Sequence, residues 1–177
     1  MGTIFIAGSY GVGKSTLCKA LSNVLDVPAY SAGDLISNVN GEEYGANKAV
    51  QNKEKNQDIL AIEVKKKLQQ HPTILLAGHF CIFDKLNHVE KLPDSVFREL
   101  LIERILLLEA DPERIILNLN VRKKKKYERR QIETILKEER SAAEFVSKQC
   151  GCSLYIYQMT FSKLDLQKCC EFLTAEV

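Results

Sequence analysis

The chain has 177 residues, and its 45% hydrophobic and 27% charged residues are ordinary for a globular protein, which argues against global disorder. Its net charge of +2 excludes a polycation, so any contact with nucleic acid has to be local. No apolar run approaches the roughly 18 residues of a membrane-spanning helix. The first apolar run, residues 4–7, stops at a glycine-rich stretch, so we expect no secretory signal. These features predict a cytoplasmic protein whose six cysteines are free thiols.

Short apolar runs alternate with amphipathic segments along the chain. The runs typical of buried strands are residues 3–7, 27–30, 73–77, 104–110 and 154–158. Apolar residues at helical spacing predict helices over residues 14–25, 48–70, 130–149 and 162–175. The sequence Asp111-Pro112-Glu113 predicts one more helix start, whereas residues 33–45 are polar and punctuated by glycine. This order predicts an α/β fold with a five-stranded parallel sheet, helices on both faces, and ligands at the carboxyl ends of the strands.

A phosphate-binding motif follows the first predicted strand and opens the first predicted helix. Residues 8–16, GSYGVGKST, match G-x-x-x-x-G-K-[ST] in full. The glycines allow successive N–H groups to turn toward an anion at the helix N-terminus. Lys14 is expected to contact the β- and γ-phosphates, and the Ser15 hydroxyl is expected to bind Mg²⁺. The predicted nucleotide-binding residues are Gly8, Ser9, Tyr10, Gly11, Val12, Gly13, Lys14, Ser15 and Thr16.

Three further motifs follow in the order found in a known family. The chain resembles the small P-loop nucleotide kinases, in particular adenylate-kinase-like proteins of the compact, short-lid type. SAGDLIS (residues 31–37) resembles the acceptor-side motif S-T-G-D-[LM]-[LIV]-R, and LLAGHF (75–80) stands where that family has D-G-F or D-T-H. LLEADPERI (107–115) resembles the passage into an arginine-bearing lid.

The resemblance carries expectations about architecture and ligands. It implies one three-layer P-loop domain over residues 1–177 that uses ATP and Mg²⁺. Within that domain it implies an acceptor-binding segment at about residues 31–70 and a short basic lid at about residues 118–131.

Three positions depart from the family pattern. Ser37 stands where the family usually has an arginine for the acceptor phosphate, and Ala77 stands where an aspartate often organises Mg²⁺. Asn118 stands where a lid arginine commonly stacks on adenine, although Arg122, one turn later, fits the next arginine position. These departures leave the identity of the acceptor open.

Two residues after predicted strands are the candidates for contact with the acceptor. Asp34 follows the second strand, where its carboxylate could take a proton from an acceptor hydroxyl or hold a Mg²⁺-bound water. A turn-forming aspartate is the structural alternative. His79 follows the third strand and could bind the acceptor, or it could be a structural histidine. Glu109 and Asp111 are expected to be a strand-end acid and a helix cap.

The run RKKKKYERR places seven basic residues within residues 122–130. In phosphoryl transfer, cations held around the moving group stabilise its charge, and arginine is suited to that task. Arg122 and one of Arg129 or Arg130 are therefore expected to act in the closed lid. The predicted catalytic residues are Lys14, Asp34, Arg122 and Arg129. The lysines of the run are expected to form mostly a solvated face, and a nucleic-acid contact is the remaining interpretation.

The sequence thus favours a Mg²⁺- and ATP-dependent phosphotransferase that acts on a nucleoside monophosphate or another small acceptor. A second interpretation keeps this chemistry but phosphorylates a hydroxyl on a metabolite or on a polynucleotide 5′ end, with Asp34 as base. A third is a nucleotide-regulated binding module that contacts nucleic acid or a protein through the basic run. No oligomeric state is predicted.

Overall fold

The computed structural model describes residues 2–41, 53–84, 86–121 and 127–175. Five strands form one parallel sheet with the order β2-β3-β1-β6-β7. The strands are β1 (Thr3–Gly8), β2 (Ala29–Ser31), β3 (Ile74–Ala77), β6 (Ile102–Glu109) and β7 (Ser153–Gln158). The predicted α/β fold with a five-stranded parallel sheet is therefore confirmed.

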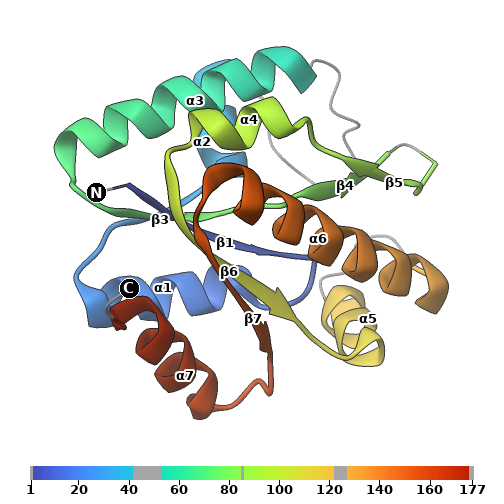
Figure 1. The fold of residues 1–177 in the computed structure, drawn as a ribbon. Helices are drawn as coiled ribbons and strands as arrows, with labels where there is room; N and C mark the ends of the chain where they lie inside the picture. The colour runs from blue at the N-terminus through green and yellow to red at the C-terminus, as the bar shows by residue number, and fades with distance from the viewer. Residues whose placement is uncertain (1, 42–52, 85, 122–126, 176–177) are drawn as a thin grey trace.

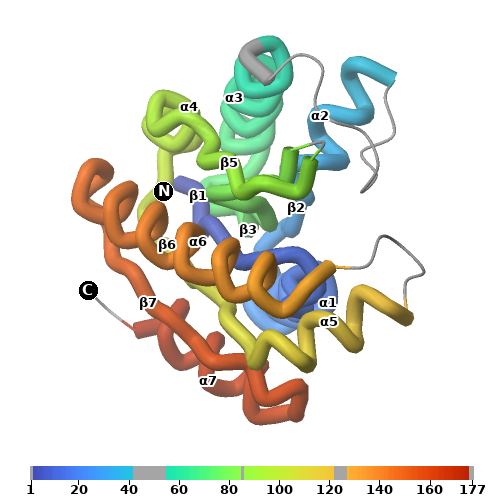
Figure 2. Tube along the Cα trace, turned by 90° about the vertical axis from the view of Figure 1, so that its right-hand side faces the viewer, coloured from blue at the N-terminus to red at the C-terminus, as the bar shows by residue number. Residues whose placement is uncertain are grey.

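Helices cover both faces of the sheet, as predicted (Figures 1 and 2). One face packs against α1 (Lys14–Leu25), α5 (Pro112–Val121) and α7 (Lys163–Thr174). The other face packs against α2 (Ala32–Asn40), α3 (Lys53–Gln70), α4 (Asp94–Glu99) and most of α6 (Arg129–Cys150). Successive side chains of a strand point to opposite faces. Accordingly, Ile4 and Ile6 of β1 join the first core, whereas Phe5 and Ala7 join the second.

Four elements were not predicted. No helix was predicted within the polar, glycine-punctuated residues 33–45, but α2 occupies their first part. Ser31 caps this helix, and Leu35 and Ile36 are buried. A hairpin of β4 (Cys81–Phe83) and β5 (Val89–Lys91) and the short helix α4 lie between β3 and β6.

The cysteines and the lengths of the helices were also the subject of predictions. All six cysteines are free, in line with the prediction, and burial raises the pKa of the Cys18 thiol to about 12. None of the helices in the described ranges is long and apolar enough to span a membrane.

Candidate active site

Register places the ends of three neighbouring strands at one level. Ile6 of β1 pairs with Ala77 of β3, and Ala77 pairs with Ser31 of β2. The residues that follow these strands, which are the P-loop, the turn at Gly78–His79 and the start of α2, therefore emerge at the same edge of the sheet. The sequence predicted this convergence from the parallel order of the strands.

The P-loop has the backbone that an anion-binding loop requires. Gly13, directly before α1, has φ 98°, and Gly8 at the end of β1 has φ 146°, both in the range that favours glycine. A Cβ atom on Gly8 would lie 2.5 Å from the carbonyl oxygen of Leu108 on β6. Helix α1 begins at Lys14, so its first N–H groups and its positive dipole end face the loop.

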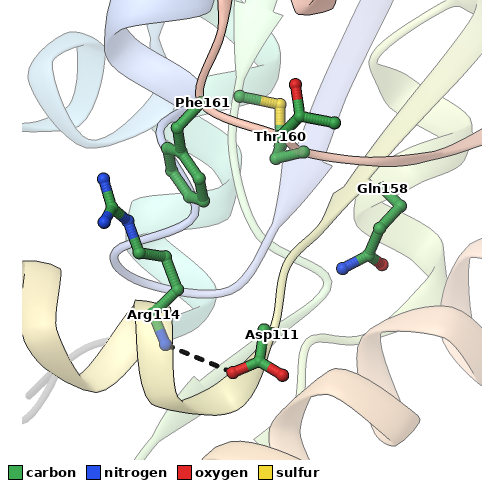
Figure 3. A pocket seen from close by; sticks show the side chains of 6 residues that line it. Asp111, Arg114, Gln158, Thr160 and Phe161 are labelled. Carbon is green, nitrogen blue, oxygen red and sulfur yellow. Dashed lines mark hydrogen bonds between the residues drawn. The ribbon is translucent and has the colours of Figure 1, made fainter.

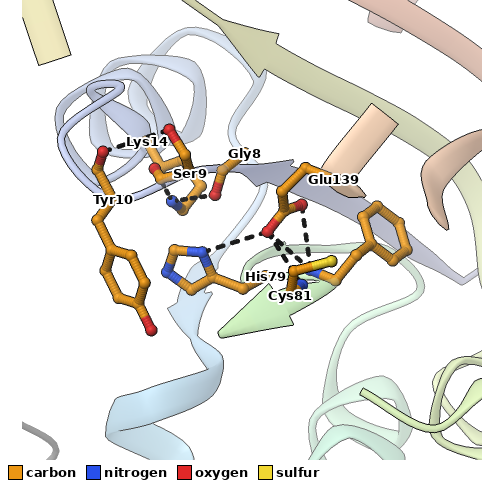
Figure 4. A network of polar contacts seen from close by, with 8 residues as sticks. Gly8, Ser9, Tyr10, Lys14, His79, Cys81 and Glu139 are labelled. Atoms are coloured by element: carbon orange, nitrogen blue, oxygen red, sulfur yellow. Dashed lines mark hydrogen bonds and ion pairs between the residues drawn. The ribbon is translucent and has the colours of Figure 1, made fainter. Parts of the chain in front are cut away.

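Lys14 turns back across the loop in this structure. Its ammonium donates hydrogen bonds to the carbonyl oxygens of Gly8, at 2.7 Å, and Ser9, at 2.8 Å (Figure 4). The neighbouring Ser15 and Thr16 are exposed in the first turn of α1. The loop thus gathers a cation, backbone donors and two hydroxyls, which is a donor set that fits triphosphate oxygens and Mg²⁺.

On the acceptor side, Asp34 lies in the first turn of α2 with its residue exposed. Its backbone N–H donates to the Ser31 hydroxyl at 3.3 Å, so the residue takes part in the cap of α2. Ser37, one turn later, donates from its hydroxyl to the carbonyl oxygen of Gly33 at 2.9 Å. Both residues lie on the element that follows β2, as expected.

His79 lies against the P-loop. Its ring lies beside that of Tyr10, with 4.3 Å between the ring centroids, and its Nδ1 lies 3.6 Å from a carboxylate oxygen of Glu139 (Figure 4). Burial and the nearby charge of Lys14 lower the pKa of His79, and contacts with Glu139 and the Gly8 carbonyl only partly oppose that change. The folded chain therefore favours the neutral imidazole more than the unfolded chain does.

Glu139 is a site residue that sequence reasoning missed. It comes from α6, is 1% exposed, and accepts hydrogen bonds from the backbone N–H groups of Phe80 and Cys81 at 3.1 to 3.2 Å. A signal was available in the sequence. Glu139 falls on the apolar stripe of α6, between Ile135 and Ala143, where a carboxylate is unexpected.

The residues assigned to the lid are only partly described. Residues 122–126, including Arg122, lie outside the described ranges. Arg129 is exposed at the start of α6 and forms ion pairs with Glu113, at 2.6 Å, and Glu133, at 2.7 Å. Its pKa is raised by the hydrogen bond and charge of Glu133 and by the charge of Glu113. In this structure Arg129 thus contacts α5 and α6 rather than the P-loop.

Glu109 and Asp111 are a strand-end acid and a helix cap, as expected, and Asn118 contacts the P-loop. Glu109, at the end of β6, forms a two-pronged ion pair with Arg140 of α6. Asp111 caps α5 by accepting from the N–H groups of Glu113 and Arg114. Asn118 donates from its side-chain amide to the carbonyl oxygen of Gly11 in the P-loop.

An open pocket of about 300 Å³ lies beside the P-loop (Figure 3). It is lined by Asp111, Arg114, Gln158, Met159, Thr160 and Phe161. The Arg114 guanidinium lies over the Phe161 ring, 5.0 Å from its centroid. A Cβ atom on Gly13 would lie 3.4 Å from Met159 and 3.6 Å from Phe161, so the pocket adjoins the P-loop directly. Apart from Asp111, which was expected to cap a helix, these residues were not singled out from the sequence.

The parallel sheet and the P-loop at its carboxyl edge define a P-loop kinase fold. A family model described as an AAA domain matches residues 7–136, well over half of the chain, and the chain belongs to that family. The prediction of a P-loop kinase fold is confirmed. The finer likeness to adenylate kinases stays a prediction.

Solved structures share the fold over nearly the whole chain. A shikimate kinase from Bacteroides thetaiotaomicron superposes with a TM-score of 0.63 and 15% identity, covering 98% of this chain and 99% of its own. A shikimate kinase from Acinetobacter baumannii, in complex with shikimate, gives 0.59 and 12%, with coverages of 98% and 93%. A gluconokinase from Sinorhizobium meliloti 1021 gives 0.55 and 10%, with coverages of 94% and 87%. Comparison with curated proteins found no match.

Proposed function

We propose that the chain transfers the γ-phosphoryl group of Mg²⁺-bound ATP to a small acceptor. One observation carries the proposal: the P-loop with Lys14, the turn with His79 and the start of α2 with Asp34 emerge at one edge of the sheet. Donor and acceptor could therefore meet there. Phosphoryl transfer needs mainly positioning and charge stabilisation, which is what such an edge supplies. The cytoplasmic location predicted from the sequence is part of the same proposal.

The proposed place of ATP follows from the donor set. The P-loop amides and Lys14 would hold the phosphates, and the exposed hydroxyl of Ser15 would hold Mg²⁺, which neutralises phosphate charge when bound. The pocket next to Gly13 is suited to a nucleobase, because the Arg114–Phe161 pair offers a flat face and Gln158 and Thr160 offer hydrogen-bonding groups. This pocket is the proposed base site.

A nucleoside monophosphate is the first proposed acceptor, bound by the segment of residues 31–70 and covered by residues 118–131. The SAGDL sequence at the start of α2 supports it. Aromatic rings also support it: Tyr10 is stacked on Phe83 with 5.9 Å between centroids, and Phe83 on Tyr127 with 4.8 Å. Such rings are suited to contact with a base. Arg122 and Arg129 are proposed to bind the transferring group, for which Arg129 would have to exchange its two glutamate partners.

A hydroxyl acceptor is the second candidate, favoured by two observations. Residues 31–70 contain no arginine, the residue best suited to grip a monophosphate in a two-pronged way. The exposed Asp34 could instead accept the proton of an acceptor hydroxyl as its oxygen attacks the γ-phosphorus and ADP departs.

A phosphoryl-transfer screen tests these proposals. The wild-type chain is incubated with Mg²⁺ and γ-labelled ATP, and with a panel of nucleoside monophosphates, nucleosides, small hydroxylated metabolites and 5′-hydroxyl oligonucleotides. Label on a monophosphate would support the first acceptor, and label on a hydroxyl the second. If ATP binds and no acceptor is labelled, the phosphotransferase proposal fails and the nucleotide-regulated binding module takes its place.

A further inference from the structure

The turn after β3 is held at both ends, which leaves His79 in a fixed position. On one side, the Gly78 N–H donates to the Ile6 carbonyl of β1 at 3.0 Å. On the other side, the Phe80 carbonyl accepts from Leu92, and the Phe80 ring packs edge-on against Phe5 with 5.1 Å between centroids. The other backbone polar group of Phe80 is its N–H, which donates to the Glu139 carboxylate.

Glu139 is an unusual residue for a buried helix face. A carboxylate that is 1% exposed has lost its water and needs hydrogen-bond donors in exchange. Within the described part of the chain, its hydrogen-bond donors are the N–H groups of Phe80 and Cys81, and His79 Nδ1 lies 3.6 Å away. Neutral acceptors such as backbone carbonyl groups could satisfy the amides of this turn without burying a charge. The buried charge of Glu139 therefore points to an effect beyond these two hydrogen bonds.

That second effect is on the imidazole. A ring nitrogen that faces a carboxylate is stabilised when it carries the proton, because a lone pair at that position would face the negative charge of Glu139. His79 Nδ1 is the nitrogen that faces it. In the neutral imidazole the other nitrogen, Nε2, then carries the lone pair and accepts hydrogen bonds. Figure 4 shows this second nitrogen on the side of the ring away from Glu139.

We propose that Glu139 is a positioning residue: it holds His79 with Nδ1 protonated and Nε2 presented as an acceptor at the edge where the phosphoryl acceptor binds. This inference rests on the proposed function. Glu139 is buried and its carboxylate is occupied by the Phe80 and Cys81 amides, so it does not contact substrate directly. It acts only through His79 and the turn. His79 in turn orients the acceptor by accepting a hydrogen bond from it.

The first test reads the tautomer and needs no activity. Long-range proton–nitrogen NMR correlation of the ¹⁵N-labelled wild-type chain at neutral pH assigns the protonated ring nitrogen, and His79→Gln identifies the His79 signals among the three histidines. We expect Nδ1 to be protonated in wild type, and Glu139→Gln to shift His79 to the other tautomer or to a mixture. A wild-type ring protonated at Nε2 would overturn the proposal.

The second test is kinetic and uses a matched control on the same helix. Glu139→Gln is expected to lower kcat about tenfold or more while leaving the KM for ATP within about twofold. Glu138→Gln, next in sequence and paired with Lys91 at 3.0 Å, is expected to leave both unchanged. Combining Glu139→Gln with His79→Gln should lower kcat no further than His79→Gln alone, because the two residues act as one unit. Additive losses would overturn the proposal.

The outcomes also separate this inference from the proposed function. If Glu139→Gln fails to fold, the wild-type tautomer and the kinetics of His79→Gln test the inference instead. A full kcat in His79→Gln would then refute it. If wild type transfers no phosphoryl group, the proposed function fails, and with it the catalytic part of the inference, while the tautomer still decides whether Glu139 and His79 are paired.

Discussion

Asn118 of α5 donates a hydrogen bond of 2.9 Å to the carbonyl oxygen of Gly11, 107 residues earlier in the chain. The bond ties the first residue of the predicted lid segment, on α5, to the loop that is expected to hold phosphates. Gly11 has φ 77°, so the loop is held there in a conformation that few residues adopt. Asn118, which stands where adenylate-kinase-like proteins commonly have an arginine, thus contacts the P-loop backbone itself.

Asn118→Ala is therefore expected to loosen the P-loop and weaken ATP binding. The loss of one partly buried hydrogen bond corresponds to about 1 kcal/mol, or roughly fivefold in the dissociation constant. Isothermal titration with Mg²⁺-ATP measures it, and Asn120→Ala, an exposed residue on the same helix, serves as the control. An unchanged ATP affinity in Asn118→Ala would show that this bond does not shape the loop.

Lys14→Ala is expected to abolish phosphoryl transfer, with a loss of about 100-fold or more, because the only cation of the P-loop sequence is removed. The fold should persist, since the ammonium contacts loop carbonyl oxygens rather than the core. Steady-state kinetics and circular dichroism check the two parts separately. Lys19→Ala, exposed further along α1, is the control. Full activity in Lys14→Ala would show that the site has been assigned to the wrong residues.

Arg114→Ala is expected to raise the KM for ATP about two- to fivefold, because a base at the proposed site would lose a contact with the guanidinium that lies over Phe161, and such a contact is worth about 0.5–1 kcal/mol. The value of kcat should change little, since the base is remote from the transferring group. Arg98→Ala, on α4 and paired with Gln149, is a control on the other face of the sheet. Equal KM values in Arg114→Ala and Arg98→Ala would remove the pocket from the ATP site.

Arg122→Ala and Arg129→Ala are each expected to lower kcat about tenfold or more, and to affect ATP affinity less, because their proposed contacts form in the transition state. Kinetics together with binding measurements separate the two effects. Lys137→Ala, exposed on α6, provides a cation-removal control. A kcat within experimental error of wild type would exclude the altered arginine from the mechanism, and for Arg129 its glutamate pairs would then be purely structural.

Local motifs and alternating apolar runs predicted most of the fold and the P-loop. Each of those features is encoded in consecutive residues, and the parallel sheet follows from their order. The hairpin β4–β5 escaped prediction because its strands have three residues each and depend on pairing with each other. Glu139 escaped because its partners, Phe80 and Cys81, lie 58 to 59 residues away, and only its place on an apolar stripe signals burial.

Asp165 organises the loop that borders the proposed base site. Its carboxylate is 3% exposed and accepts hydrogen bonds from the Tyr157 hydroxyl, the N–H and hydroxyl of Thr160, and the N–H of Ser162. Burial alone would raise the pKa of Asp165, but the hydrogen bonds from Thr160 and Tyr157 outweigh it and lower the pKa below the ordinary value of 3.8. The folded chain therefore favours the ionised carboxylate more than the unfolded chain does.

Asp165→Asn is thus expected to lower the free energy of unfolding at neutral pH by about 1.5–3 kcal/mol, the range for hydrogen bonds to a charged group. Because the folded pKa is lowered, this stabilisation is fully present above the unfolded pKa and is lost as pH falls through the folded one. Urea unfolding at decreasing pH should show a difference in the free energy of unfolding between wild type and Asp165→Asn. This gap should stay constant down to about pH 4 and narrow below it. Asp58→Asn, exposed on α3, should show no such gap. A gap that widened on acidification would mean that the ionised carboxylate does not stabilise this loop.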